Sequence, residues 1–142
     1  MIKIDKFKDD YAYLSNFFHA PLTVLGIPFQ NSESAYMACK TLDIEERQKF
    51  SNVPGNVAKK MGRKLILRPG WDDGILKVEC MELCLRSKFQ HNPHLAVKLA
   101  STGDIELIEG NTWGDTFWGV CGGQGENMLG KLLMEVRKSY QN

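Results

Sequence analysis

Residues 71–90 read WDDGILKVECMELCLRSKFQ, and this stretch is expected to form the longest helix of the chain. Apolar residues recur there at helical spacing, which predicts one broad buried face made by Ile75, Val78, Met81, Leu85 and Phe89. We expect this helix to begin at Trp71. A second strong helix is expected from Met128 to about Tyr140, where leucines recur with a period near 3.6 residues. Helix should therefore dominate the fold.

Further helix signals lie on either side of residues 71–90. Asn31 is typical of an N-cap, and Glu33 falls in the first turn, where the helix dipole favours an acid. That helix should run to about Leu42. An apolar stripe predicts another helix, which opens at Pro54 and carries Val57, Met61, Leu65 and Ile66. Short helices are also expected at residues 44–50 and after Pro93.

The first thirty residues favour β-structure. Ile2 and Ile4 alternate with charged residues, and residues 22–29 predict a hairpin that turns at Leu25-Gly26. Another short strand is expected at residues 105–108. Together these segments predict a mainly helical α+β fold with a small, mostly N-terminal antiparallel sheet. The length of 142 residues predicts a single domain over residues 1–142.

Composition is that of an ordinary soluble globular protein, with 43% apolar and 25% charged residues. Eighteen Lys and Arg against seventeen Asp and Glu leave a net charge of +1, which gives no sign of bulk electrostatic binding to duplex nucleic acid. No apolar run is long enough for a membrane span, and the first residues do not resemble a signal peptide. We expect a cytoplasmic protein that has no membrane contact.

The four cysteines form no Cys-x-x-Cys pair and are expected to be reduced, buried small hydrophobes. A nucleophilic Cys121 is an alternative, but no histidine lies near it in the sequence to activate it. The pair His91 and His94 is a weak metal signal. We therefore expect no metal and no cofactor.

Residues 111–118, Asn-Thr-Trp-Gly-Asp-Thr-Phe-Trp, place one carboxylate among three aromatic rings. Ordinary cores avoid this mixture, because a buried carboxylate without a partner is strongly destabilising. The pattern favours a site for a planar substrate whose reactive centre becomes positively charged, with Asp115 beside the charge and Asn111 and Trp118 as binding residues. In the alternative interpretation, the tryptophans fill the core and Asp115 caps a helix or a turn.

A second candidate carboxylate is Glu33, which shares one helix face with Tyr36 and Lys40. An acid, a phenol and an amine on one face could form the wall of a site. A solvated surface stripe is the equally open alternative.

Cations are concentrated near residue 60, at Lys59, Lys60, Arg63, Lys64 and Arg68. A solvated basic face would explain them, as would a phosphate clamp, for which Arg63 is the best candidate because a guanidinium binds phosphate bidentately. Trp71 follows and could contact a nucleotide base. Asn16 and Phe17 could hold a ribose or base, or could form a capped turn over the core.

Several of these residues recur in one ordered pattern: Ser15-Asn16-Phe17, Pro21, Gly26, Ser32-Glu33, Tyr36, Lys40, Met61-Gly62-Arg63, Trp71, Leu85-Arg86-Ser87-Lys88-Phe89, Asp115-Thr116-Phe117-Trp118-Gly119 and Asn127-Met128-Leu129-Gly130. The pattern resembles the NADAR superfamily, also described as YbiA-like N-glycosidases. This resemblance implies a helix-rich α+β domain that works without metal or cofactor and cleaves N-glycosidic bonds at ribose. The implied substrates are ribosylamino phosphate intermediates of riboflavin synthesis, or ADP-ribose attached to a nucleobase such as guanine in DNA. ADP-ribosylated nucleic acid is then a candidate partner.

Carried over by position, the functional glutamate and aspartate of the family match Glu33 and Asp115. The site lysine matches Lys40, and the site tryptophans match Trp71 and Trp118. We expect these five residues to line one pocket. Two departures concern the substrate: Phe29 stands where relatives often have tryptophan, and residues 121–126 replace a stretch that is usually more basic.

The implied reaction passes through an oxocarbenium-like state, with positive charge at the anomeric carbon. Asp115 is expected beside that charge, and Glu33 is expected to act as general acid or base. Lys40 would set the charge of one of the two acids, or would capture the opened sugar as a Schiff base. The other functions considered are a non-catalytic ADP-ribose or nucleotide-binding module and a protein-interaction domain.

Overall fold

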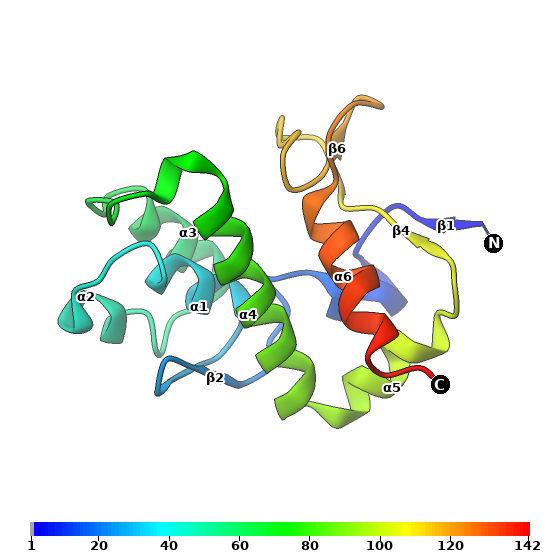
Figure 1. The fold of residues 1–142 in the computed structure, drawn as a ribbon, viewed down its shortest axis with the longest axis horizontal. Helices are drawn as coiled ribbons and strands as arrows, with labels where there is room; N and C mark the ends of the chain where they lie inside the picture. Colours follow the sequence, from blue (N-terminus) through cyan, green and yellow to red (C-terminus); the bar gives the residue numbers. More distant parts are fainter. Residues whose placement is uncertain (1) are drawn as a thin grey trace. The chain divides into compact units, whose positions relative to one another are not determined.

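The computed structural model describes residues 2–142, and their contacts divide them into two compact units (Figure 1). The terminal unit comprises residues 2–15 and 93–142, and the middle unit comprises residues 16–92. Both consist mainly of helices with short strands, which confirms the mainly helical α+β class. The expectation of a single domain stays a prediction.

The middle unit is built around three helices. The first, α1 (Ser32–Ala38), packs against both α3 (Gly55–Gly62) and α4 (Ile75–His91). Gly62 makes the close approach of α1 and α3 possible, because a Cβ there would collide with the Met37 side chain. A short helix, α2 (Ile44–Gln48), follows α1 within the predicted range.

The predicted hairpin is confirmed. Strand β2 (Leu22–Val24) pairs antiparallel with β3 (Ile27–Phe29), and α4 covers β2. The turn residues Leu25 and Gly26 have φ values of 54° and 78°. Positive φ at both central residues is the pattern of a type I′ turn, which matches the twist of the flanking strands.

The beginning of α1 follows the prediction, but its end does not. The Asn31 side chain accepts a hydrogen bond from the Ser34 backbone N–H at 2.8 Å, as an N-cap should. The helix ends at Ala38 rather than near Leu42. Arg68 explains the difference, since its backbone N–H and guanidinium donate to the carbonyls of Lys40 and Cys39. A residue distant in sequence thus donates hydrogen bonds to the carbonyl groups that follow the helix.

Two predicted features of the other middle-unit helices were wrong. The helix that follows Pro54 ends at Gly62, so Leu65 and Ile66 lie outside it and Ile66 is 91% exposed. The longest helix begins at Ile75, because Gly74 at φ 88° separates it from a 3₁₀ turn, η2 (Trp71–Asp73). Of the predicted face, Met81, Leu85 and Phe89 are buried, Val78 is half-buried and Ile75 is exposed. The other buried residues of this helix are Cys80, Cys84, Ser87 and Lys88.

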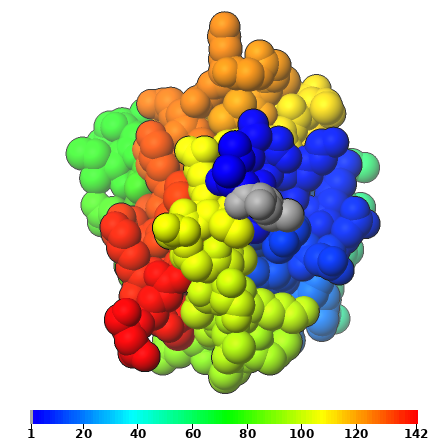
Figure 2. Space-filling view, turned by 90° about the vertical axis from the view of Figure 1, so that its right-hand side faces the viewer, coloured from blue at the N-terminus to red at the C-terminus, as the bar shows by residue number. Residues whose placement is uncertain are grey.

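The N-terminal strand is shorter than predicted. Strand β1 (Lys3–Ile4) gives way to a 3₁₀ helix, η1 (Asp9–Leu14), where Asp9 adopts a positive φ of 54°. β1 pairs parallel with β4 (Glu106–Leu107), so the confirmed strand at residues 105–108 is its partner. Figure 2 shows the N-terminal residues in blue beside the yellow residues that follow α5 (Pro93–Ser101). Among the strand pairs of residues 2–142, the predicted antiparallel pairing holds for the hairpin, whereas β1 pairs in parallel.

The terminal unit is completed by α6 (Met128–Lys138) and by a parallel pair, β5 (Gly110–Asn111) with β6 (Val120–Cys121). Leu129, Leu132, Leu133 and Val136 of α6 are buried as predicted, whereas Tyr140 lies beyond the helix. Asn127 joins α6 to the end of β4: its amide donates to the Leu107 carbonyl at 2.9 Å and accepts from the Glu109 N–H at 2.9 Å. The segment after β4 is therefore tied to the beginning of α6.

Cys39, Cys80 and Cys84 are buried and free, as predicted, and Cys121 is half-buried. Within residues 2–142, no helix is both long and apolar enough to cross a bilayer.

Candidate functional site

The middle unit places Glu33 at the buried beginning of α1, where its side chain is 8% exposed. Asn16 holds this helix end: its carbonyl accepts from the Glu33 N–H at 3.0 Å, and its side-chain oxygen accepts from the Ser32 hydroxyl at 2.8 Å. Asn16 is itself buried, and its amide also points to the Met81 sulfur at 3.4 Å. In this structure Asn16 therefore positions the glutamate-bearing turn.

The predicted face of α1 is a packed wall rather than a solvated stripe. The rings of Tyr36 and Trp71 are both buried, with centroids 5.6 Å apart and planes tilted by 46°. The Lys40 amine lies 5.8 Å from the centre of the Tyr36 ring. Glu33, Tyr36, Lys40 and Trp71 are thus brought together in one unit.

Burial and neighbouring charges shift the pKa values of Tyr36 and Lys40 in this cluster. Burial raises the pKa of Tyr36 well above its ordinary value, and the negative charge of Glu33 raises it further. Burial lowers the pKa of Lys40, although Glu33 opposes the shift. Two further cations, Lys77 and Arg63, also lower the Lys40 pKa. A larger fraction of the Lys40 amine is therefore unprotonated at neutral pH than for a lysine in water.

Lys77 is a functional candidate that the sequence analysis missed. It lies in the first turn of α4, where no motif distinguishes it from other surface lysines. Its relation to Lys40 depends on the packing of α1 against α4. Phe17, in contrast, is 46% exposed, with the Lys59 amine 5.9 Å from its ring centre.

The terminal unit carries Asp115 in a tightly bonded loop. Its Oδ1 accepts hydrogen bonds from the backbone N–H groups of Phe117 at 3.1 Å and Trp118 at 2.9 Å. The interpretation of Asp115 as a turn cap is therefore correct for Oδ1. Oδ2 takes part in neither of these two bonds, and the side chain is half-buried.

The loop is held by α6 and by Asn111. The N–H groups of Met128 and Leu129 at the beginning of α6 donate to the carbonyls of Phe117 and Trp118 at 3.0 and 2.9 Å. These donors have no partner inside the helix, so the loop supplies one. The Asn111 amide accepts from the Asp115 N–H and donates to the Asp115 carbonyl. Asn111 is thus committed to shaping the loop, and its predicted substrate contact stays a prediction.

Two aromatic rings and one further carboxylate accompany Asp115. The rings of Phe117 and Trp118 meet edge to face, with centroids 4.9 Å apart. Glu109, which the sequence analysis missed, accepts from the Asn111 amide at 3.0 Å. Its place directly after the predicted strand at residues 105–108 was the available signal, because side chains at strand ends often serve sites.

The model of the NADAR domain matches residues 4–141. This chain belongs to the NADAR domain family. It is 39% identical over 134 residues to the N-glycosidase YbiA of Shigella flexneri, an alignment that covers 92% of this chain and 82% of that protein. The solved NMR structure of E. coli YbiA matches with a TM-score of 0.83 at 36% identity, covering 97% of this chain and 84% of that one. A riboflavin biosynthesis protein of Vibrio vulnificus is 36% identical over 137 residues, which are 94% of this chain and 36% of that protein.

The NADAR resemblance expected from the motifs is therefore confirmed, and the structure explains one of its glycines. Gly130 lies so close to the Leu107 carbonyl that a Cβ would collide with it. Phe29, one of the two departures, is buried in the hairpin opposite Leu22. Residues 121–126, the other departure, begin with a tight turn in which the backbone of Cys121 and Gln124 is bonded in both directions. A catalytic role of Cys121 has no support in this geometry.

The predicted site residues of this NADAR chain fall into two clusters. Glu33, Tyr36, Lys40 and Trp71 form one cluster in the middle unit, which also contains Asn16, Phe17 and Arg63. Asn111, Asp115 and Trp118 belong to the terminal unit. The expectation that residues of both clusters line one pocket stays a prediction.

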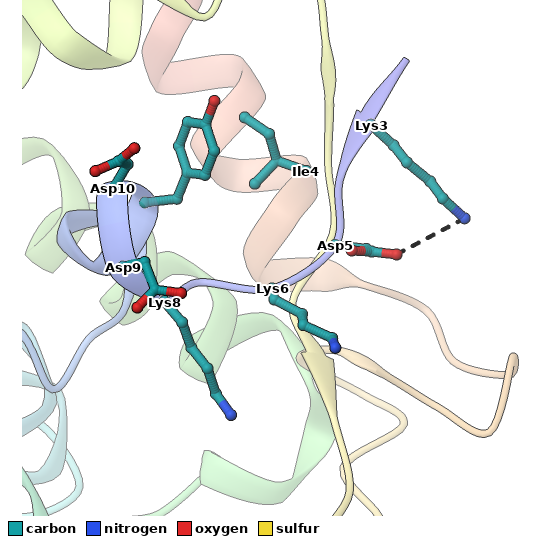
Figure 3. Close-up of a pocket in the computed structure, with 8 residues that line it drawn as sticks. Lys3, Ile4, Asp5, Lys6, Lys8, Asp9 and Asp10 are labelled. Carbon is teal, nitrogen blue, oxygen red and sulfur yellow. Dashed lines mark ion pairs between the residues drawn. The ribbon is translucent and has the colours of Figure 1, made fainter. Parts of the chain in front are cut away.

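The terminal unit also contains a hollow of about 430 Å³ (Figure 3). Its lining mixes lysines and aspartates and consists of Lys3, Ile4, Asp5, Lys6, Lys8, Asp9, Asp10 and Tyr11. Lys3 and Asp5 form an ion pair at 3.9 Å with both side chains about half exposed. Opposite charges that face water neutralise one another, so this hollow is a poorer candidate than either cluster.

Proposed function

We propose that this chain is an N-glycosidase that hydrolyses the bond between a nitrogen and the anomeric carbon of a ribose. The substrate is an ADP-ribosyl group on a nucleobase, including guanine in DNA, or a ribosylamino phosphate. The main support is the buried Glu33 beside an amine of lowered pKa and two aromatic rings. The names of the YbiA and riboflavin-related relatives agree with this chemistry.

Glycosidic cleavage needs two functions that carboxyl groups supply. One group must transfer a proton and activate water, and another must stabilise the oxocarbenium-like charge. Glu33 suits the first role, since it is buried and its charge acts on both Tyr36 and Lys40. Asp115 suits the second, because two backbone N–H groups fix its Oδ1 and leave Oδ2 for the sugar. We propose that both acids act on one substrate.

Lys40 has two roles compatible with its lowered pKa. As a charged group it would hold Glu33 in its ionised form during part of the cycle. As a free amine it would add to the C1 aldehyde of the opened ribose, release water and form a Schiff base, which water later hydrolyses back to amine and sugar. Borohydride trapping of a covalent adduct distinguishes the second role from the first.

A non-catalytic nucleotide-binding module is the second candidate. Aromatic Tyr36 and Trp71 and the nearby cations Arg63 and Lys77 are features that a nucleotide binder also needs. In that case the two acids would only orient the ribose hydroxyl groups.

The decisive experiment measures release of free base from ADP-ribosylated DNA, ADP-ribosyl nucleosides, NAD and ribosylaminopyrimidine phosphates. We expect turnover of at least one of them, and a loss of about 100-fold or more in Glu33→Gln. Glu79→Gln, an exposed acid on α4, is the matched control and should keep full activity. Tight binding without base release would support the binding module instead. Absence of both binding and release would contradict both candidates.

Among the cations near residue 60, we expect Arg63 to matter most. Arg63→Ala should raise KM by about 10- to 100-fold, the effect of losing a charged hydrogen bond to phosphate. Lys60→Ala and Lys64→Ala should change KM by less than about threefold, because exposed point charges contribute little. Lys59 packs over Phe17, so its effect should be small and structural. Equal losses at all four positions, with a steep salt dependence, would indicate a diffuse nucleic-acid-binding surface.

A further inference from the structure

Glu109 is joined to Asp115 by a single side chain. The Asn111 amide nitrogen donates to Glu109 Oε2 at 3.0 Å and to the Asp115 carbonyl at 2.9 Å. The Asn111 oxygen accepts from the Asp115 N–H at 3.0 Å. The acid that faces the substrate in the proposed function is thus connected, through one amide, to a second acid in the same unit.

This arrangement gives Glu109 control over the orientation of Asn111. An ionised carboxylate only accepts hydrogen bonds, so the NH₂ side of the amide must face Glu109. The amide oxygen then has to face the Asp115 N–H. A flipped amide would set oxygen against the carboxylate and NH₂ against the Asp115 N–H, and the bonds that hold the loop would be lost.

Glu109 is itself rigidly held. Its N–H donates to the Asn127 side chain at 2.9 Å, and its carbonyl accepts from the Val120 N–H at 2.8 Å. Gly119 packs so closely on Glu109 that a Cβ would collide with both its backbone carbonyl and its carboxylate. A side chain anchored in this way can transmit position to its hydrogen-bond partner.

We propose that Glu109 is a positioning residue, which sets the orientation of Asn111 and thereby fixes Asp115 for catalysis. The proposal rests on the proposed function, because it takes Asp115 as the group beside the reacting sugar. Glu109 acts through hydrogen-bond acceptance and transfers no proton. Its removal should therefore lower kcat and leave KM nearly unchanged.

The kinetic test compares E109A, E109Q, N111A and the double variant E109A/N111A on the best substrate of the panel. E109A should lower kcat by about 10- to 100-fold, the range found for acids that orient metal-ligating histidines. E109Q keeps an acceptor oxygen and should restore most of that loss, with an unshifted pH profile. The double variant should be no slower than N111A, since both changes break one connection. E106A, an exposed acid in β4, is the control.

Amide hydrogen exchange tests the same network without a substrate. In E109A the N–H groups of Phe117 and Trp118, which bond to Asp115 Oδ1, should exchange at least about tenfold faster. In E109Q their exchange should stay near that of the unmodified chain. If the panel finds no substrate, the proposed function fails while this measurement still decides whether Glu109 positions the loop.

Three results would overturn the proposal. An E109Q variant as slow as E109A, with a shifted pH profile, would make Glu109 a proton-transfer residue. Additive losses in E109A/N111A would show that Glu109 does not act through Asn111. Unchanged exchange in E109A, with activity reduced only in proportion to the folded fraction, would leave Glu109 with a purely structural role.

Discussion

Replacement of Asp115 by asparagine is expected to lower kcat by about 100-fold or more, with little change in melting temperature or substrate affinity. Asparagine keeps the oxygen that accepts from the N–H groups of Phe117 and Trp118, so the loop should keep its shape. The charge that would stabilise the oxocarbenium-like state is lost. Turnover, ligand titration and thermal melting of this one variant provide the measurement.

Two comparisons make the Asp115→Asn result interpretable. Asp115→Ala should lose the turn bonds as well, and should therefore lower both activity and stability. Glu106→Gln, which changes an exposed acid in β4 of the same unit, should change neither. A folded Asp115→Asn protein that binds substrate and turns it over at a near-normal rate would end the catalytic assignment.

The second large effect is expected from Gly119→Ala, which should destabilise the protein by about 3 kcal/mol or more. A Cβ at this position would meet the Glu109 backbone carbonyl and carboxylate and the Asn111 amide. The neighbouring backbone cannot give way easily, because the carbonyls of Glu109 and Gly119 accept hydrogen bonds from Val120 and Asn127. Urea unfolding of the variant measures the loss.

Gly114→Ala is the control for Gly119→Ala. Gly114 adopts a positive φ of 86°, but a Cβ there would meet nothing within 4 Å. This change should cost only the backbone strain of a left-handed residue, about 1–2 kcal/mol. Equal and small losses in the two variants would show that the loop adapts and that close packing at Gly119 is not required.

The proposed chemistry assigns different tasks to the two clusters. In the middle unit, burial lowers the pKa of Lys40 and places Glu33 among aromatic rings. In the terminal unit, two backbone N–H groups hold Oδ1 of Asp115 in place. A proton-transfer group profits from an apolar environment, whereas a group that must stay charged profits from N–H donors. The two environments therefore fit the two roles of a glycosidase.

Features that depend on neighbouring residues could be predicted from the sequence. The cap at Asn31, the turn at Leu25-Gly26 and the apolar period of α6 each follow from a few adjacent side chains. The helical face that Glu33 and Tyr36 share likewise follows from helix geometry, whereas Lys40 lies beyond the end of α1 at Ala38. The family motifs added the expectation that Glu33 and Asp115 act together, which no local pattern contains and which stays a prediction.

Other features were decided by contacts between distant segments. Arg68 ends α1 early, and β4 takes up β1 as a parallel partner, although about 100 residues separate the two strands. The cations Arg63 and Lys77, which act on Lys40, also come into place only when separate elements pack. The sequence by itself thus determined the local turns and caps and the side chains that could serve a site. Long-range packing decided which of these side chains are buried or paired, because burial and pairing depend on every neighbour in space.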